Sequence, residues 1–331
     1  MSVRIGTRAS KLALTQTQQT ADRLAAVGGF PVELVHIRTE GDVRTGSLSQ
    51  MGGTGVFVAA LRDSLLAETC DVAVHSLKDL PTGAEPGLTI AATPKRVDVR
   101  DVLCARDGLT LAELPGGAKI GTGSPRRAAQ LRAARPDVEV LDIRGNVDTR
   151  LGRVPGLPGN ATDDVVEGKS NDLDAVVLAA AGLERMGRLD TVTEYFETSV
   201  MLPAPGQGAL AIECRTSDAP QRGQAGGGEG VLAQALSALN DDDTRLAVTA
   251  ERAVLARLEA GCAAPVGAYA FRKGSMLHLE AVVCAVDGTR TVREKKATDG
   301  LTEVGATLLG IEVAEQLLAA GAAEIADLAA S

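Results

Sequence analysis

The alternation of apolar and polar residues predicts an N-terminal α/β unit in which strands and helices follow one another. The strand and helix patterns of this unit cover residues 3–7, 11–27, 31–37, 56–68 and 71–74. Ser10 stands where an N-cap is expected before the first helix, and Gly28-Gly29 ends it. A glycine-dense stretch at 39–55 is typical of a functional loop, and we interpret it as a lid.

A second unit repeats this order. Lys119-Ile120-Gly121-Thr122 matches Arg4-Ile5-Gly6-Thr7, and a serine, a helix and arginine follow each of them. Ser124 as N-cap and Pro125 at the first helical position mark the second helix start. The strand at 71–74 is matched in the same way by one at 174–177. The repeat predicts two similar α/β domains that face one cleft.

The remaining chain predicts a return to the first domain and then a smaller third domain. Residues 201–209 have the Pro and Gly content of a hinge, and the next strand is expected at 209–213. Helices and strands of a small α+β domain are predicted at 243–258, 267–271, 277–286 and 303–318. The predicted domains are 1–96 plus 200–217, 97–199 and 231–331, with loop insertions at 154–171 and 217–230.

Composition narrows the class of protein. Aromatic residues make up 2% of the chain and Trp is absent, which leaves little ring surface for stacking on nucleic-acid bases. The net charge of −9 also argues against binding to nucleic acid or an anionic membrane. No apolar run approaches the ~20 residues of a membrane helix. We expect a cytoplasmic protein without a metal site, because the three His and five Cys are scattered and show no C-x-x-C.

Positive charge is concentrated in one segment of this acidic chain. Residues 119–153 contain one lysine and seven arginines against four acids, an excess of +4, so the rest of the chain carries −13. Arg126 and Arg127 begin a helix, where the helix dipole and free backbone amides favour an anion. Arg144 and Arg150 follow a strand expected at 141–143, and Arg8 follows the first strand. Each arginine alone could be an ordinary solvated residue, but together they indicate an anion-binding cleft.

Two further positions carry candidate chemistry. Residues 75–79 place a hydroxyl, an ammonium and a carboxylate at the end of a strand, where ligands bind in open α/β sheets. A solvated surface ion pair is the more frequent explanation for an isolated Lys78-Asp79 step. Cys262 follows Gly261 in a loop and lies off any apolar stripe, so it is the one cysteine that we interpret as an accessible nucleophile or attachment point.

Five motifs in one order resemble those of the porphobilinogen deaminase (hydroxymethylbilane synthase) family over nearly the whole chain. They are His75-Ser76-Leu77-Lys78-Asp79-Leu80-Pro81, Gly121-Thr122-x-Ser124-x-Arg126-Arg127, Arg144-Gly145-Asn146-Val147-x-Thr149-Arg150, Pro205-Gly206-Gln207-Gly208-Ala209 and Glu259-x-Gly261-Cys262. The resemblance implies two domains like those of periplasmic binding proteins and a third that carries a dipyrromethane cofactor. It also implies a monomeric transferase of haem biosynthesis that joins four porphobilinogen molecules head to tail, releases ammonia and yields linear hydroxymethylbilane.

The resemblance also assigns roles to residues. Asp79 becomes the catalytic carboxylate, and Cys262 becomes the anchor of the cofactor through a thioether. The residues that it implies for holding cofactor or substrate carboxylates are Arg8, Ser10, Ser76, Lys78, Thr122, Ser124, Arg126, Arg127, Arg144, Arg150 and Gln207. Gln50 and Thr54 depart from the family pattern, because many members carry lysines in this lid.

Two other classes of function compete with this interpretation. A solute-binding protein would also pair two α/β domains around an anion site, although it would not require Cys262. A nucleic-acid-binding protein could use the arginine-rich segment, and its affinity would depend steeply on salt.

Overall fold

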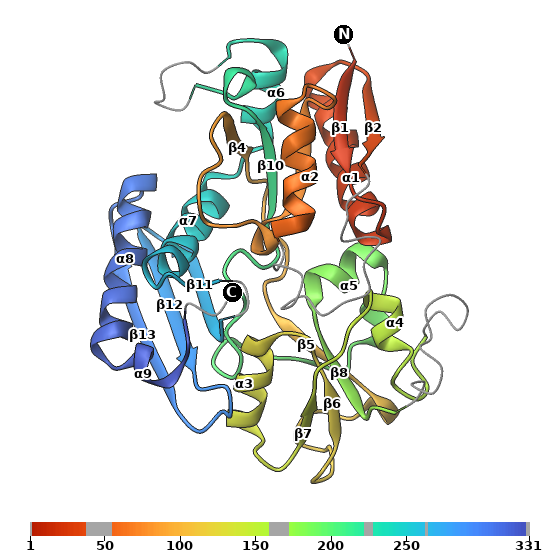
Figure 1. Cartoon of the computed structure of the whole chain (residues 1–331), viewed down its shortest axis with the longest axis vertical. Coiled ribbons are helices and arrows are strands. Elements are labelled where there is room, and N and C mark those ends of the chain that lie inside the picture. Colours follow the sequence, from red (N-terminus) through yellow and green to blue (C-terminus); the bar gives the residue numbers. More distant parts are fainter. Residues whose placement is uncertain (1, 38–54, 159–171, 222–227, 262–263, 329–331) are drawn as a thin grey trace.

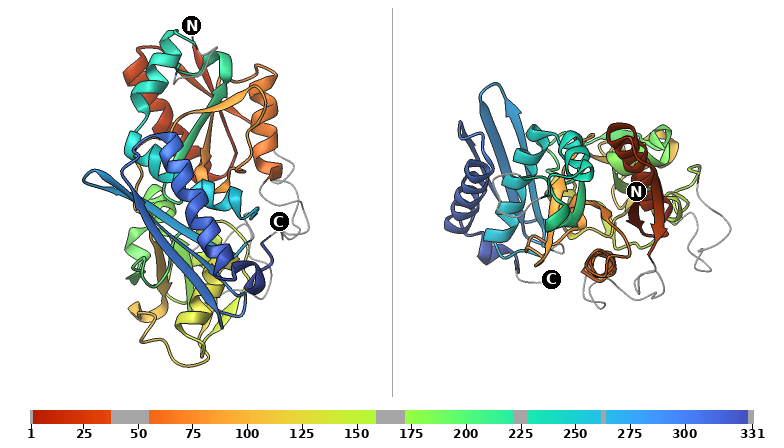
Figure 2. Two further views of the ribbon diagram at one scale, coloured as in Figure 1. Left: turned by 90° about the vertical axis from the view of Figure 1, so that its left-hand side faces the viewer. Right: turned by 90° about the horizontal axis from the view of Figure 1, so that it is seen from above.

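The computed structural model describes residues 2–37, 55–158, 172–221, 228–261 and 264–328. Within these residues the chain forms three sheets, two of five strands and one of three. The two larger sheets lie one above the other along the long axis of the molecule, and the third sheet with its helices lies beside them (Figures 1 and 2).

The first sheet has the order β2-β1-β3-β10-β4. Its strands are β1 (Val3–Thr7), β2 (Val32–His36), β3 (Val72–Ser76), β4 (Leu88–Ala92) and β10 (Leu210–Arg215). The helices of this part are α1 (Lys11–Gly28), α2 (Gly55–Leu66) and α6 (Val231–Leu239). β1, β2 and β3 run parallel, whereas β10 is antiparallel to both of its neighbours.

The second sheet has the order β7-β6-β8-β5-β9 and repeats this topology strand for strand. Its strands are β5 (Asp101–Ala105), β6 (Lys119–Gly121), β7 (Glu139–Leu141), β8 (Ala175–Ala179) and β9 (Glu194–Tyr195), and its helices are α3 (Pro125–Ala134), α4 (Val147–Leu151) and α5 (Ala180–Met186). β6, β7 and β8 are parallel, and β5 is the antiparallel strand that corresponds to β10. The structure therefore confirms the predicted internal repeat.

Matching carboxylates fix the equivalent strands of the two sheets. Asp71 accepts a hydrogen bond from the backbone N–H of Arg4 at 2.9 Å, and Asp174 accepts one from Lys119 at 2.7 Å. Each carboxylate also pairs with an arginine, Asp71 with Arg4 and Asp174 with Arg106. The repeat thus extends to the ion pairs at the start of the parallel strands.

The chain crosses between these sheets twice, as expected for two units joined by hinges. It passes from β4 to β5, and it returns from β9 to β10. Glu251 is fully buried and forms hydrogen bonds with both crossings. Its carboxylate accepts two hydrogen bonds from Arg96 in the first crossing (2.6 and 3.0 Å) and one from the N–H of Gly206 in the return crossing (2.7 Å). A fourth comes from the N–H of Ala270 at 2.8 Å. One carboxylate therefore ties both crossings to the third sheet.

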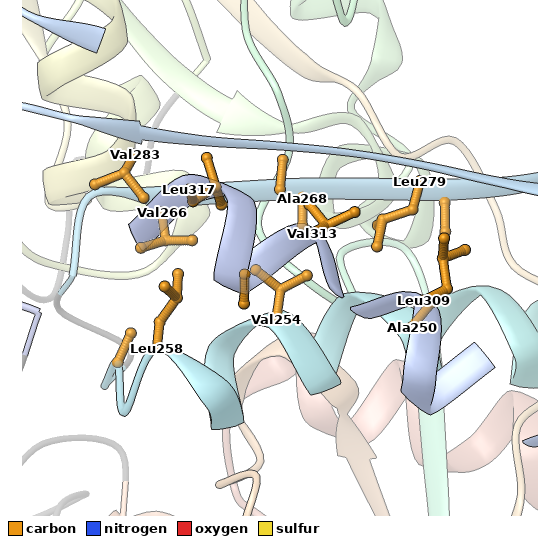
Figure 3. Packing of buried hydrophobic residues seen from close by; sticks show 14 of the residues in the cluster. Ala250, Val254, Leu258, Val266, Ala268, Leu279, Val283, Leu309, Val313 and Leu317 are labelled. Carbon is orange, nitrogen blue, oxygen red and sulfur yellow. The ribbon is translucent and has the colours of Figure 1, made fainter. Parts of the chain in front are cut away.

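The third sheet, β11-β12-β13, is antiparallel throughout. Its elements are α7 (Asp242–Arg257), β11 (Val266–Lys273), β12 (Met276–Cys284), β13 (Thr291–Thr298), α8 (Glu303–Ala319) and α9 (Ala322–Ile325). Figure 3 shows Ala250 and Val254 of α7, the C-cap Leu258, and Leu309 and Val313 of α8 beside the buried side chains of β11 and β12. The two helices approach closely because Gly310 of α8 has no side chain. A Cβ at this position would clash with the backbone oxygen of Ala250.

Most predicted boundaries differ from the structure by a few residues, and two of the differences bear on the site and the domains. The strand expected at 141–143 covers Glu139–Leu141 instead. The sequence places residues 231–239 in the third domain, whereas α6 packs its buried Ala235 and Leu236 into the core of the first sheet. α6 contacts α1 and β4. The glycine-rich segment before α6 gives no sign in the sequence that the helix returns to the first sheet.

Candidate functional site

A short turn follows β3 and presents the predicted carboxylate. Leu77–Asp79 forms one turn of 3₁₀ helix, in which Leu77 is buried and Asp79 is exposed. The N–H of Leu77 donates to Ala209 at 3.1 Å, and Gly206, at φ +78°, lies so close that a Cβ would be 3.1 Å from Leu77 Cγ. The return crossing thus packs against the buried side of the turn, and Asp79 lies on its solvent-exposed side.

Lys78 links this turn to the return crossing. Its Nζ lies 3.4 Å from Oε1 of Gln207, which is fully buried. Burial and the neighbouring Arg127 lower the pKa of Lys78 to about 8, although Asp79 and Asp101 act in the opposite direction. Lys78 is therefore a buried lysine with Arg127 and the carboxylates Asp79 and Asp101 around it, and a lysine with such a shift is a candidate functional residue.

Arg126 and Arg127 surround Asp101 at the start of β5. Arg126 Nη1 lies 2.7 Å from Asp101 Oδ2 and 2.6 Å from the backbone oxygen of Leu202. Arg127 donates from Nε to Asp101 Oδ1 at 2.9 Å and from Nη1 to the backbone oxygen of Val177 at 3.1 Å. Although burial raises the pKa of Asp101, the two guanidinium groups outweigh it and lower that pKa strongly. The two arginines that the sequence suggested as anion ligands are therefore buried, and both are ion-paired with one carboxylate.

The predicted hydroxyl groups lie at the helix starts. Ser10 caps α1 by accepting from the N–H of Ala13 at 3.3 Å, and Ser124 caps α3 by accepting from Arg127 at 3.4 Å. Thr122 accepts from the N–H of Ser124 at 3.3 Å. Ser76 lies 3.2 Å from the side-chain amide of Gln16. These serines and Thr122 therefore shape the turns at the carboxyl ends of β1, β3 and β6.

Arg144 precedes α4, and Arg150 lies in the last turn of that short helix. Arg144 is exposed and its Nη2 is 3.5 Å from Asp142, while Arg150 donates to the backbone oxygen of Gly145 at 2.9 Å. Burial and the nearby Arg127 and Arg144 lower the pKa of Arg150 to about 10. Arg8 is half-buried in the turn between β1 and α1. We call Lys78, Arg127, Arg144 and Arg150 the cation cluster. In addition to burial, Arg127 lowers the pKa of Lys78, and Arg127 and Arg144 lower the pKa of Arg150.

Cys262 lies outside the described residues, as do Gln50 and Thr54. The chain before it leaves α7 through Glu259, whose backbone has φ +53°, and then reaches Gly261. The other four cysteines are buried, and burial raises the pKa of Cys70, Cys104 and Cys284 to about 11 and that of Cys214 to about 12. They are thus unreactive core residues, as the sequence predicted.

Sequence reasoning missed Asp101 and Arg185. Asp101 begins a strand that had not been predicted, and a single carboxylate at a strand start gives no signal of its partners. Arg185 of α5 donates to the backbone oxygen of Gly208 at 2.9 Å, and burial lowers its pKa to about 10. Among the described residues, no cluster of three metal-ligating side chains occurs. No described helix is long and apolar enough to cross a membrane.

Comparison with known proteins gives one consistent result. The family profile described as "Porphobilinogen deaminase, dipyromethane cofactor binding domain" matches residues 3–222, and the profile of the C-terminal domain of porphobilinogen deaminase matches residues 245–319. The porphobilinogen deaminase of Cutibacterium acnes is 54% identical and covers 100% of this chain and 98% of its own. That of Micrococcus luteus is 52% identical over 97% of this chain and 93% of its own length. That of Leifsonia xyli subsp. xyli is also 52% identical, over 99% of this chain and 95% of its own length.

Solved structures also resemble the chain, at low sequence identity. A periplasmic substrate-binding protein of an ABC transporter from Coxiella burnetii is 13% identical with a TM-score of 0.41, over 72% of this chain and 91% of its own. The methionine-binding protein MetQ is 11% identical with a TM-score of 0.38, over 71% and 89%.

Proposed function

The chain belongs to the porphobilinogen deaminase family, and on that premise we propose that it joins four porphobilinogen units head to tail, releases one ammonia with each, and yields hydroxymethylbilane. The observation that carries the proposal is the position of Asp79. It is an exposed carboxylate at the carboxyl end of β3, next to Lys78 and near enough to Arg127 to raise the pKa of that guanidinium.

Asp79 is the catalytic carboxylate in this proposal. When the aminomethyl group of porphobilinogen loses ammonia, the pyrrole ring and its methylene carbon carry a positive charge. A fixed carboxylate beside the ring stabilises that charge and accepts a hydrogen bond from the pyrrole N–H. The 3₁₀ turn supports this role, because the buried Leu77 on one side and Leu80 on the other hold the backbone that carries Asp79.

The cation cluster binds carboxylates in this proposal. Porphobilinogen and the rings of a dipyrromethane each bear an acetate and a propionate, so a growing chain accumulates negative charge. The lowered pKa values of Lys78 and Arg150 support a fit to such a polyanion. Burial and then neighbouring arginines disfavour the charged forms of both side chains, and an added anion would stabilise those forms. Cys262 would hold a dipyrromethane through a thioether, and this group would supply the pyrrole carbon that accepts the first unit. Arg8, Arg126, Ser10, Ser76, Thr122, Ser124 and Gln207 complete the proposed set by orienting these groups.

Intact-protein mass spectrometry tests the proposed attachment. Protein from a haem-synthesising host is expected to carry the added mass of two linked pyrrole units, and Cys262→Ser is expected to carry none. Cys214→Ser is the matched control, because Cys214 is fully buried and its thiol pKa is raised to about 12. A bare polypeptide mass for the unsubstituted chain would favour a solute-binding protein instead.

The pH dependence of catalysis tests Lys78. Because its pKa is about 8, the ammonium is present below that pH and is lost as pH rises through it. We expect kcat/KM for porphobilinogen to fall as pH rises through about 8, since kcat/KM reports the free enzyme. Lys78→Arg keeps its charge and is expected to lose this alkaline limb. An identical limb in both proteins would contradict the role of Lys78.

We also propose that each sheet is the centre of a domain. The domains predicted at 1–96 plus 200–217 and at 97–199 agree with the strand composition of the two larger sheets, and the third is better begun after α6. We propose a cytoplasmic monomer, which sedimentation at several concentrations tests. Binding of duplex DNA at low salt would instead support the nucleic-acid alternative.

A further inference from the structure

We propose that Asp101 is a positioning residue for the reaction: it fixes the orientation of Gln207, which holds Lys78 beside Asp79. Asp101 is fully buried, so it acts through the three side chains that it contacts, Arg126, Arg127 and Gln207. The inference rests on the proposed function, because it concerns how Lys78 is set for that reaction.

The side-chain amide of Gln207 is held in one orientation. Its Nε2 lies 2.9 Å from Asp101 Oδ1 and 2.8 Å from the backbone oxygen of Val99. Both of these atoms only accept hydrogen bonds, so they require the NH₂ end of the amide. The carbonyl end of Gln207 is consequently the one that faces Lys78 Nζ, at 3.4 Å. An ammonium group only donates, and Asp101 therefore selects the amide orientation that Lys78 needs.

Asp101 connects Lys78, through Gln207, with Arg126 and Arg127 of α3. Its Oδ1 accepts from both Gln207 and Arg127, while its Oδ2 accepts from Arg126. One carboxylate therefore positions groups from both larger sheets. It positions Lys78, which follows β3, through Gln207, and it pairs directly with the two guanidinium groups of α3. Because β5 follows the first crossing and Gln207 lies in the return crossing, Asp101 is placed where both crossings meet the site.

The charges that face Lys78 predict what removal of Asp101 does. Burial, Arg127 and Arg126 lower the pKa of Lys78, whereas Asp79 and Asp101 raise it. When the charge of Asp101 is removed, Asp79 is the carboxylate among these groups that still raises the pKa of Lys78. The pKa of Lys78 is therefore expected to fall, which favours its neutral amine. A residue that only stabilised the fold would not move the titration of Lys78.

Two variants and a control test the proposal. In Asp101→Asn, we expect the midpoint of Lys78, followed by NMR of ¹³Cε-labelled lysine and assigned with Lys78→Gln, to fall below the unsubstituted value of about 8. The alkaline limb of kcat/KM is expected to move to lower pH with it, and Asp101→Glu is expected to move it back. Asp98→Asn is the control, because Asp98 pairs with Arg100 in the same segment. It is expected to leave both readouts unchanged.

Gln207→Met supplies a test that keeps Asp101 and both arginines. It removes the acceptor of Lys78, and we expect kcat to fall about 10- to 100-fold in a protein that still folds. The melting temperature is expected to fall as well, because the backbone oxygen of Val99 and Asp101 each lose a hydrogen-bond donor. An unmoved Lys78 titration in folded Asp101→Asn, or full activity in Gln207→Met, would overturn the proposal. The NMR titration needs no substrate. It therefore tests the link between Asp101 and Lys78 even if the unsubstituted chain does not turn over porphobilinogen, which is the result that would contradict the proposed function.

Discussion

An Asp79→Asn variant is expected to lose about 100- to 1,000-fold in kcat for hydroxymethylbilane formation while it keeps its fold. The amide has nearly the shape of the carboxylate and still accepts a hydrogen bond, but it carries no charge to stabilise a pyrrolic cation. Asp79 is exposed and lies at the open side of its turn, so the substitution leaves no buried group without a partner. Single-turnover kinetics with porphobilinogen, together with intact mass, separates lost chemistry from lost cofactor.

Asp63→Asn is the matched control, because Asp63 is a carboxylate of α2 outside the described site. It is expected to keep the kcat of the unsubstituted chain. Formation of hydroxymethylbilane by Asp79→Asn at a near-normal rate would contradict the catalytic role of Asp79.

Glu251→Ala is expected to destabilise the protein by about 3–5 kcal/mol, the range seen when one partner of a buried ion pair is removed. The guanidinium of Arg96 would remain buried without its carboxylate, and the N–H groups of Gly206 and Ala270 would lose their acceptor. Differential scanning calorimetry is expected to show a melting temperature lowered by on the order of 10 °C.

Glu315→Ala provides the comparison for Glu251. Glu315 pairs with Arg257 at 2.6 Å, but its side chain is half exposed and solvent screens the pair. We expect a change of about 0–1 kcal/mol there. Equal melting temperatures for the two variants would show that Glu251 does not hold the crossings.

The sequence predicts those parts of the fold that local chemistry determines. Ser10 and Ser124 cap helices that begin one residue later, as their positions before the helical patterns indicated. The repeated strands carry the same apolar alternation in both units, so the shared topology could be inferred. The signal is local in each case, because a cap or an alternating strand needs only neighbouring residues.

Partners that lie far apart in the sequence could not be predicted in this way. Arg126 and Arg127 have the pattern of an anion site at a helix start, yet their shared carboxylate, Asp101, comes from a strand across the sheet. Arg127→Leu would therefore leave Asp101 with one cation fewer in the core, in addition to any effect on ligands. Glu251 is hidden for the same reason, because its four hydrogen bonds come from three separate segments.

The position of β10 in the first sheet has a consequence for how the chain matures during synthesis. β3 is flanked by β1 on one side and by β10 on the other, with Leu210 opposite Ser76. The ribosome makes the whole second sheet before β10 emerges, so β3 keeps an open edge during that interval. We expect the turn that carries Asp79 to become fixed only when β10 joins the sheet, and a nascent chain that stops before Leu210 should hold a folded second sheet and an unformed catalytic turn.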